Sequence, residues 1–100
     1  MRIIAQSNLT AYGRRHSDAE ASLREWINRT RAADWKATSE VQAAFPKAKV
    51  LNGERVRFEV AGGKHRLIAA MDFEKGIAFV KFLGSHTEYD RVDALSVCLF

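Results

Sequence analysis

The residues best suited to chemistry gather in one short stretch, Ser85-His86-Thr87-Glu88-Tyr89-Asp90. An imidazole transfers protons near neutral pH more readily than any other side chain. A phenol can donate a proton or a hydrogen bond, and a carboxylate can orient an imidazole. His86, Tyr89 and Asp90 are therefore candidate catalytic residues. The alternative is structural, with His86 beside a helix cap and Tyr89 in the core.

Two cations are expected close to this stretch. Arg66 begins one apolar run and Lys81 lies near the end of the next, with a turn at residues 74–76 between them. If the two runs pair as a hairpin, both cations lie near the sheet edge that carries His86. Cleavage of RNA by its own 2′-hydroxyl needs a base, an acid and a cation at the phosphate, and these side chains could supply all three. We expect neither a metal nor another cofactor, because no group of carboxylates accompanies His86.

Positive charge is concentrated in the middle of the chain. The protein has a formal net charge of +4, and residues 47–66 contain six Lys or Arg residues against only Glu54 and Glu59. Such a local excess indicates a polyanion partner or, alternatively, a solvated strand face that binds nothing. Under the first interpretation, the candidate RNA-binding residues here are Lys47, Lys49, Arg55, Arg57 and Lys64.

The first half of the chain has the pattern of helices that follow one strand. A β-branched run at residues 2–5 predicts a strand, and a short helix capped by Ser7 or Asn8 should then end within residues 13–16. Apolar residues at three- and four-residue steps predict a helix over residues 18–33, which a capping box of Ser17 and Glu20 would open. A third, short helix, capped by Ser39 and Gln42 together, should stop at Pro46.

The second half has the pattern of strands. Apolar and charged residues alternate over residues 55–60, which predicts a half-buried strand with a basic outer face. The apolar runs 66–73 and 77–83 predict central strands covered on both faces. Glycine-containing turns lie at 52–53, 62–63 and 74–76. Because helices and strands are segregated, we expect one α+β domain over residues 1–100, with a twisted, mainly antiparallel sheet.

Composition narrows the class of protein further. No apolar run approaches the ~20 residues that span a bilayer, and the first residues lack the long apolar segment of a secretory signal. Cys98 is the only cysteine, which excludes an intrachain disulfide and indicates a reducing cytoplasm. We expect Trp26 and Trp35 in the core and Cys98 packed as a small hydrophobe. The apolar segment 95–100 should be tucked into the core or form part of an interface.

Motifs along nearly the whole chain resemble one family, the HigB-type toxins. The motifs are Asp18-Ala19-Glu20, Leu23-Arg24, Trp26, Ala33-Asp34-Trp35-Lys36, Phe45-Pro46, Arg57-Phe58, Arg66-Leu67-Ile68, Phe79-Val80-Lys81-Phe82 and the ending Ser85-His86-x-Glu88-Tyr89-Asp90-Arg91. The resemblance implies a RelE-like fold, cleavage of messenger RNA on the ribosome, and a HigA-type antitoxin through which alone operator DNA is bound. Carried over by position, the active-site candidates are Arg66, Lys81, His86, Tyr89 and Asp90.

Two positions depart from the family's usual Gly-Asn-Lys-Tyr-Arg run, which here reads Gly62-Gly63-Lys64-His65-Arg66. The missing Asn leaves the geometry of the turn open. His65 replaces an aromatic residue, so it could stack on an RNA base, take part in proton transfer or simply fill the position. We include it among the RNA-binding candidates. The departures leave room for a toxin fold without activity, and the charge alone would also suit a binding module without catalysis.

Overall fold

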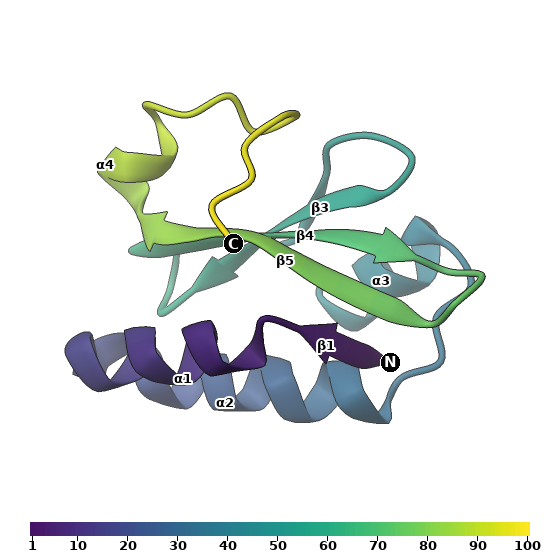
Figure 1. Cartoon of the computed structure of the whole chain (residues 1–100), viewed down its shortest axis with the longest axis horizontal. Coiled ribbons are helices and arrows are strands. Elements are labelled where there is room, and N and C mark those ends of the chain that lie inside the picture. Colours follow the sequence, from purple (N-terminus) through teal and green to yellow (C-terminus); the bar gives the residue numbers. More distant parts are fainter.

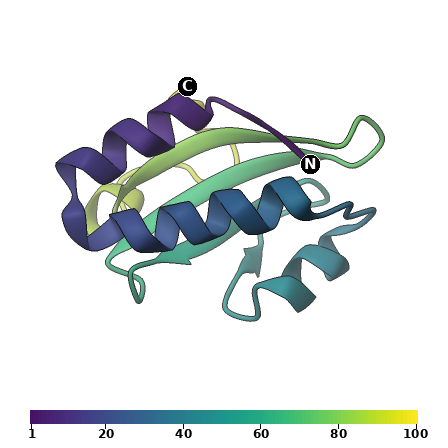
Figure 2. The same cartoon turned by 90° about the horizontal axis from the view of Figure 1, so that it is seen from below.

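The computed structural model describes residues 1–100 and contains four helices and one five-stranded sheet. The elements in chain order are β1 (Arg2–Ile4), α1 (Gln6–Arg15), α2 (Ser17–Ala32), α3 (Thr38–Ala44), β2 (Lys49–Val50), β3 (Arg55–Val60), β4 (His65–Asp72), β5 (Ile77–Ser85) and α4 (His86–Tyr89). Helices α1 and α2 lie side by side under one face of the sheet (Figures 1 and 2). The α+β class that the sequence predicts is confirmed.

The strands are ordered β1-β5-β4-β3-β2, so β4 is central. Neighbours from β2 to β5 pair antiparallel, and their connections contain the three predicted glycine turns. Strand β1 instead pairs parallel to β5, because the helices carry the chain away before it returns to the sheet. At the turn after β3, Gly62 and Gly63 have φ angles of 69° and 92°, a region in which glycine is free of strain. Asn also tolerates positive φ, so the departure to Gly63 preserves the turn.

The core lies between the two long helices and the sheet face toward them, which we call the inner face. Helix α2 buries Leu23, Trp26 and Ile27 against it. The Trp26 ring packs edge-on against Phe58 of β3 at 5.3 Å between centroids. Trp35 is 8% exposed and packs near Phe45, so both tryptophans occupy the predicted core. The opposite face of the sheet, which we call the outer face, carries Arg57 and Arg66 by strand alternation.

The predicted helix caps differ from those in the structure. Ser17 forms no capping box, because α1 ends at Arg15 and the single residue His16 joins the two helices, which places Ser17 already inside α2. Ser39 likewise lies inside α3, which begins without a side-chain cap. The capping box that does form is at α4, where Ser85 and Glu88 exchange hydrogen bonds. The cap positions of α2 and α3 are instead occupied by His16 and Ala37, neither of which makes a side-chain cap.

The chain after α4 turns back over the outer face (Figure 1). Arg55 Nη1 donates hydrogen bonds to the carbonyl oxygens of Ala94 and Val97 at 3.1 and 2.8 Å, and Leu99 N donates to Lys81 O at 2.7 Å. Leu95, Leu99 and Phe100 nevertheless remain exposed. The expectation that Cys98 packs as a small hydrophobe is wrong, because the segment lies on the surface of the sheet and leaves Cys98 exposed.

Candidate functional site

Two arginines from neighbouring strands share one carboxylate on the outer face. Glu59 of β3 pairs in register with Arg66 of β4, and Arg57 lies two residues before Glu59 on the same side of its strand. Glu59 Oε2 is 3.5 Å from Arg57 Nη2 and 3.7 Å from Arg66 Nη1. The arginine side chains are only 16% and 12% exposed. Two mostly buried guanidiniums therefore share a single anion.

Tyr89 of α4 completes this group. Its ring centroid is 6.0 Å from the Arg57 guanidinium and 5.9 Å from that of Arg66, which is within the range of a cation–π contact. Phe82 of β5 lies against the same ring at 6.2 Å between centroids. We call Arg57, Glu59, Arg66 and Tyr89 the arginine cluster. Sequence reasoning placed Arg57 with the backbone-binding residues and missed Glu59, although the register of a predicted hairpin would have brought both to Arg66.

The capping box of α4 holds Tyr89 in place. Ser85 N donates to Glu88 Oε1 at 2.8 Å, and Glu88 N donates to Ser85 Oγ at 3.1 Å. These hydrogen bonds from the backbone and side chain of Ser85 lower the pKa of the Glu88 carboxyl below its usual value. The preceding Gly84 is required for this approach, because a Cβ there would come within 2.8 Å of the Phe82 ring. A rigid turn therefore joins the end of β5 to α4.

His86 and Asp90 are in contact along one turn of α4. His86 Nδ1 is 3.0 Å from Asp90 Oδ2, and both side chains are about half exposed, at 53% and 57%. At this distance the Asp90 carboxylate is close enough to orient the imidazole ring of His86. The spacing of three and four residues puts His86, Tyr89 and Asp90 on one side of the helix. The structure thus brings these three predicted residues together on α4, and Tyr89 is the one that contacts Arg66.

Lys81 lies apart from the other predicted catalytic residues. Arg66 pairs with Gly84, and a bulge in β5 leaves Lys81 without a partner on β4. Three residues along a strand place Lys81 about 10 Å from that row. Its Nζ is 5.4 Å from the centroid of the Phe79 ring and 3.9 Å from Cys98 Sγ of the C-terminal segment. The register therefore places Lys81 three residues from Gly84, the residue that pairs with Arg66.

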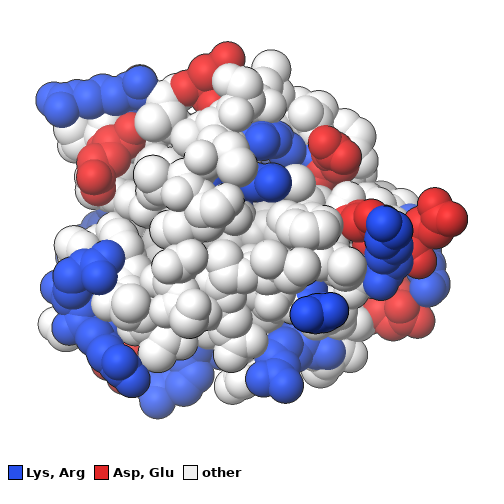
Figure 3. Space-filling view, viewed as in Figure 1, with Lys and Arg blue, Asp and Glu red and all other residues white.

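The predicted RNA-binding residues divide by exposure. Lys47, Lys49 and Lys64 are exposed. Arg55 is only 8% exposed, because the C-terminal segment covers it and accepts its hydrogen bonds. Figure 3 shows Lys and Arg side chains in separate groups with uncharged atoms between them, so the basic excess forms no continuous stripe on that side.

His65 faces the inner side of the sheet and is 6% exposed. Its Nε2 is 2.9 Å from Asp18 Oδ2, and its Nδ1 is 2.7 Å from the Tyr12 hydroxyl. Because the carboxylate accepts from Nε2, a neutral ring accepts the Tyr12 proton at Nδ1. His16 stacks on Tyr12 at 4.1 Å between centroids. This position favours a structural role for His65 and leaves its ring no free face for a base.

The charges of this buried group follow from its contacts. The hydrogen bond from His65 lowers the pKa of the Asp18 carboxyl below its usual value. Burial, together with the negative charges of Glu88 and Asp18, raises the pKa of Tyr12 to about 12. Residues 12, 18 and 65 are far apart in the chain, so no local sequence signal could have indicated this network.

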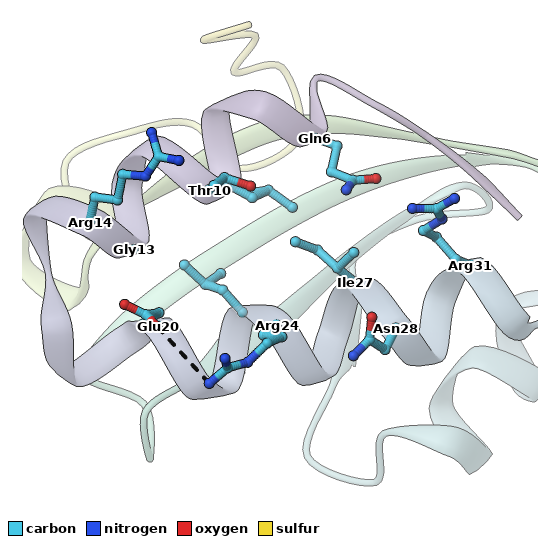
Figure 4. A pocket seen from close by; sticks show the side chains of 11 residues that line it. Gln6, Thr10, Gly13, Arg14, Glu20, Arg24, Ile27, Asn28 and Arg31 are labelled. Carbon is cyan, nitrogen blue, oxygen red and sulfur yellow. Dashed lines mark ion pairs between the residues drawn. The ribbon is translucent and has the colours of Figure 1, made fainter.

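A separate groove of about 350 Å³ runs between α1 and α2 (Figure 4). Arg14, Arg24 and Arg31 line it together with Glu20, whose carboxylate is 4.0 Å from Arg24. The sheet separates this groove from the arginine cluster. No group of three or more His, Cys, Asp or Glu side chains is arranged to hold a metal ion. None of the helices combines the length and apolar character of a membrane span.

Comparison with known proteins agrees with the motifs. A search of curated proteins found no match. The HigB_toxin family model, described as the RelE-like toxic component of a toxin–antitoxin system, matches residues 19–92. The match spans the sheet from β2 to β5, the arginine cluster and α4, and omits α1 and the end of the C-terminal segment. The chain therefore belongs to the HigB_toxin family, whose members are toxins of toxin–antitoxin systems.

Proposed function

We propose that this toxin is an endoribonuclease that cleaves messenger RNA on the ribosome. The observation that carries the proposal is the arginine cluster, whose Tyr89 lies on the same short helix as the His86–Asp90 pair. Arg57 Nε and Arg66 Nε are both buried and have no hydrogen-bond partner in the protein. Buried donors are almost always satisfied, so two unmet donors side by side favour an external acceptor. A phosphodiester supplies acceptor oxygens and a negative charge in the geometry that guanidinium groups recognise.

The reaction that suits these side chains is transesterification by the RNA itself. The 2′-hydroxyl loses its proton to a base, its oxygen bonds to phosphorus, and the bond from phosphorus to the 5′-oxygen breaks. An acid returns a proton to that 5′-oxygen, which leaves a 2′,3′-cyclic phosphate and a 5′-hydroxyl. No metal takes part in these steps.

The candidate residues divide these roles among them. Arg57 and Arg66 stabilise the charge on the five-coordinate phosphate. His86 transfers a proton through Nε2 while Asp90 orients its ring. Tyr89 orients the substrate or shares in proton transfer. Lys81, which lies about 10 Å along β5 from the Arg66 row, contacts a neighbouring phosphate rather than the one that is cleaved.

The wider assignment follows from the family. A toxin of a toxin–antitoxin system has an antitoxin as its partner. We propose a HigA-type antitoxin, and we propose that the toxin binds operator DNA only through this antitoxin. We also propose that the toxin acts in the cytoplasm. Lys47, Lys49 and Lys64 are exposed and would hold the RNA backbone by charge, so that affinity falls as salt rises.

The proposal is tested with ribosomes programmed with a defined messenger RNA, in the presence of excess EDTA. We expect cleavage products that end in a 2′,3′-cyclic phosphate. His86→Ala should lower the rate by on the order of 100-fold, whereas Lys75→Ala on the exposed turn after β4 should cleave normally. Inhibition by the chelator or a 3′-hydroxyl end would contradict the mechanism. Full growth inhibition by His86→Ala and Arg66→Ala would instead favour a binding module without catalysis.

A further inference from the structure

One acidic residue lies where the proposed substrate should bind. We infer that Glu59 is an internal substitute for the RNA phosphate, which occupies the site between Arg57 and Arg66 in the free protein and leaves when RNA arrives. This inference rests on the proposed function. It concerns which group neutralises the two arginines of that site when no RNA is bound. The contacts of Glu59, the space around it and the charge balance each support it.

The contacts of Glu59 are those of a loosely held anion. Its distances to the two arginines, 3.5 and 3.7 Å, exceed the ~2.8 Å of a charge-assisted hydrogen bond. Both contacts are made through Oε2, and the side chain remains 27% exposed. No hydrogen bond ties the carboxylate to the rest of the protein, in contrast to Glu88, which is locked in its capping box. Such a group can move at small cost.

The surroundings leave the carboxylate room to move. A Cβ at Gly63 would lie 3.1 Å from Glu59 Oε1, so the absence of a side chain there keeps the space open. Glu59 also borders a hollow of about 350 Å³ whose lining includes Arg29 and Lys47. The carboxylate therefore has open space beside Gly63 into which it can move when it leaves the arginines.

The charge balance explains why a substitute is needed. Two mostly buried guanidiniums with no anion nearby would repel each other and leave several donors unmet. One carboxylate removes much of that repulsion but leaves both Nε groups unpaired. A phosphodiester carries the same single charge on two free oxygens and can bond to both arginines at once. Glu59 thus stabilises the empty site at the expense of affinity for RNA.

The test is Glu59→Gln, which removes the charge and keeps the shape. Binding of a fluorescent oligoribonucleotide with 2′-O-methyl groups, which cannot be cleaved by this chemistry, is measured by anisotropy on the full chain. We expect affinity about fivefold higher than for the wild type, the scale of a partly exposed ion pair. The matched control is Glu74→Gln on the exposed turn after β4, which makes the same change in net charge and should alter affinity less than twofold.

Affinity that is unchanged relative to Glu74→Gln, or weaker than wild type, would overturn the inference and make Glu59 a residue that positions the arginines. If Glu59→Gln does not fold, Glu59→Asp pulls the carboxylate back from both arginines and should show a smaller gain, whereas a loss would again overturn the inference. The two proposals fail separately. Tighter binding without any cleavage by the wild type would contradict the nuclease alone, and cleavage with no gain in Glu59→Gln would contradict the substitute alone.

Discussion

His65 and Arg66 are neighbours on β4, yet the sheet gives them opposite surroundings. His65 points to the inner face, where both of its ring nitrogens have partners, Tyr12 and Asp18. Arg66 points to the outer face, where its guanidinium shares one carboxylate with Arg57 at a long distance and its Nε has no partner. The first residue has every hydrogen bond that it can make inside the protein, and the second does not.

This difference separates structure from function more sharply than residue type does. Histidine is the more usual catalytic residue, and by type alone His65 ranks above a strand arginine. Burial with both nitrogens paired instead indicates that His65 ties α1 and α2 to the sheet. The unmet donors of Arg66 cost free energy unless a ligand supplies acceptors. The comparison predicts that substitutions at the two positions affect different measurements.

The largest effect is expected on activity at Arg66. Arg66→Lys keeps the charge but loses the planar fork that can bond to two phosphate oxygens. Cleavage on programmed ribosomes should fall by on the order of 100-fold, the usual loss for one well-placed donor. The midpoint of thermal unfolding should barely change, because Arg66 makes no short hydrogen bond in the free protein. Activity of Arg66→Lys close to that of the wild type would contradict the functional role that the comparison with His65 assigns to Arg66.

The next effect is expected on stability at His65. His65→Ala leaves the buried Tyr12 hydroxyl without its partner inside the protein, and it should lower the free energy of unfolding by about 1–3 kcal/mol. Urea denaturation measures this loss. His16→Ala, which removes only a stacking contact, is the control and should cost less. If His65→Ala is as stable as the wild type but binds RNA weakly, His65 is an RNA-binding residue and not a structural one.

A pH dependence should follow from Tyr12. Its pKa is raised to about 12, so the folded state holds the phenol proton more tightly than the unfolded chain does. The resulting stability is complete below pH 10 and is lost as pH rises toward 12, at up to about 1.4 kcal/mol per pH unit. Tyr12→Phe should lack this part of the alkaline decline in urea titrations. Identical slopes for the two proteins between pH 10 and 12 would refute the prediction.

The smallest effect is expected at Gly63. Gly63→Ala places a side chain at a φ of 92° and 3.1 Å from Glu59 Oε1, and should cost about 1 kcal/mol of stability. Gly63→Asn introduces a residue that tolerates positive φ and should cost less. Thermal unfolding of both variants gives the comparison. Equal losses would mean that contact with Glu59, rather than backbone strain, sets the cost.

The sequence by itself determined the elements and the family. These elements follow from local patterns: the alternation over β3, the three- and four-residue steps of α2 and the glycine turns. Local backbone preferences depend on neighbouring residues only, so the sequence predicts them directly. The stretch from His86 to Asp90 was found in the same way, because its residues lie on one short helix. The family match over residues 19–92 confirms what the motifs indicated.

Only the tertiary structure decided which side chains meet. A bulge in β5 moved Lys81 away from Arg66, and the C-terminal segment buried Arg55, although both residues lie on predicted strands. The partners of His65 come from two helices more than forty residues earlier in the chain. Strand register, bulges and the path of a terminal segment depend on packing between residues that are distant in the chain. Local sequence patterns therefore do not predict them.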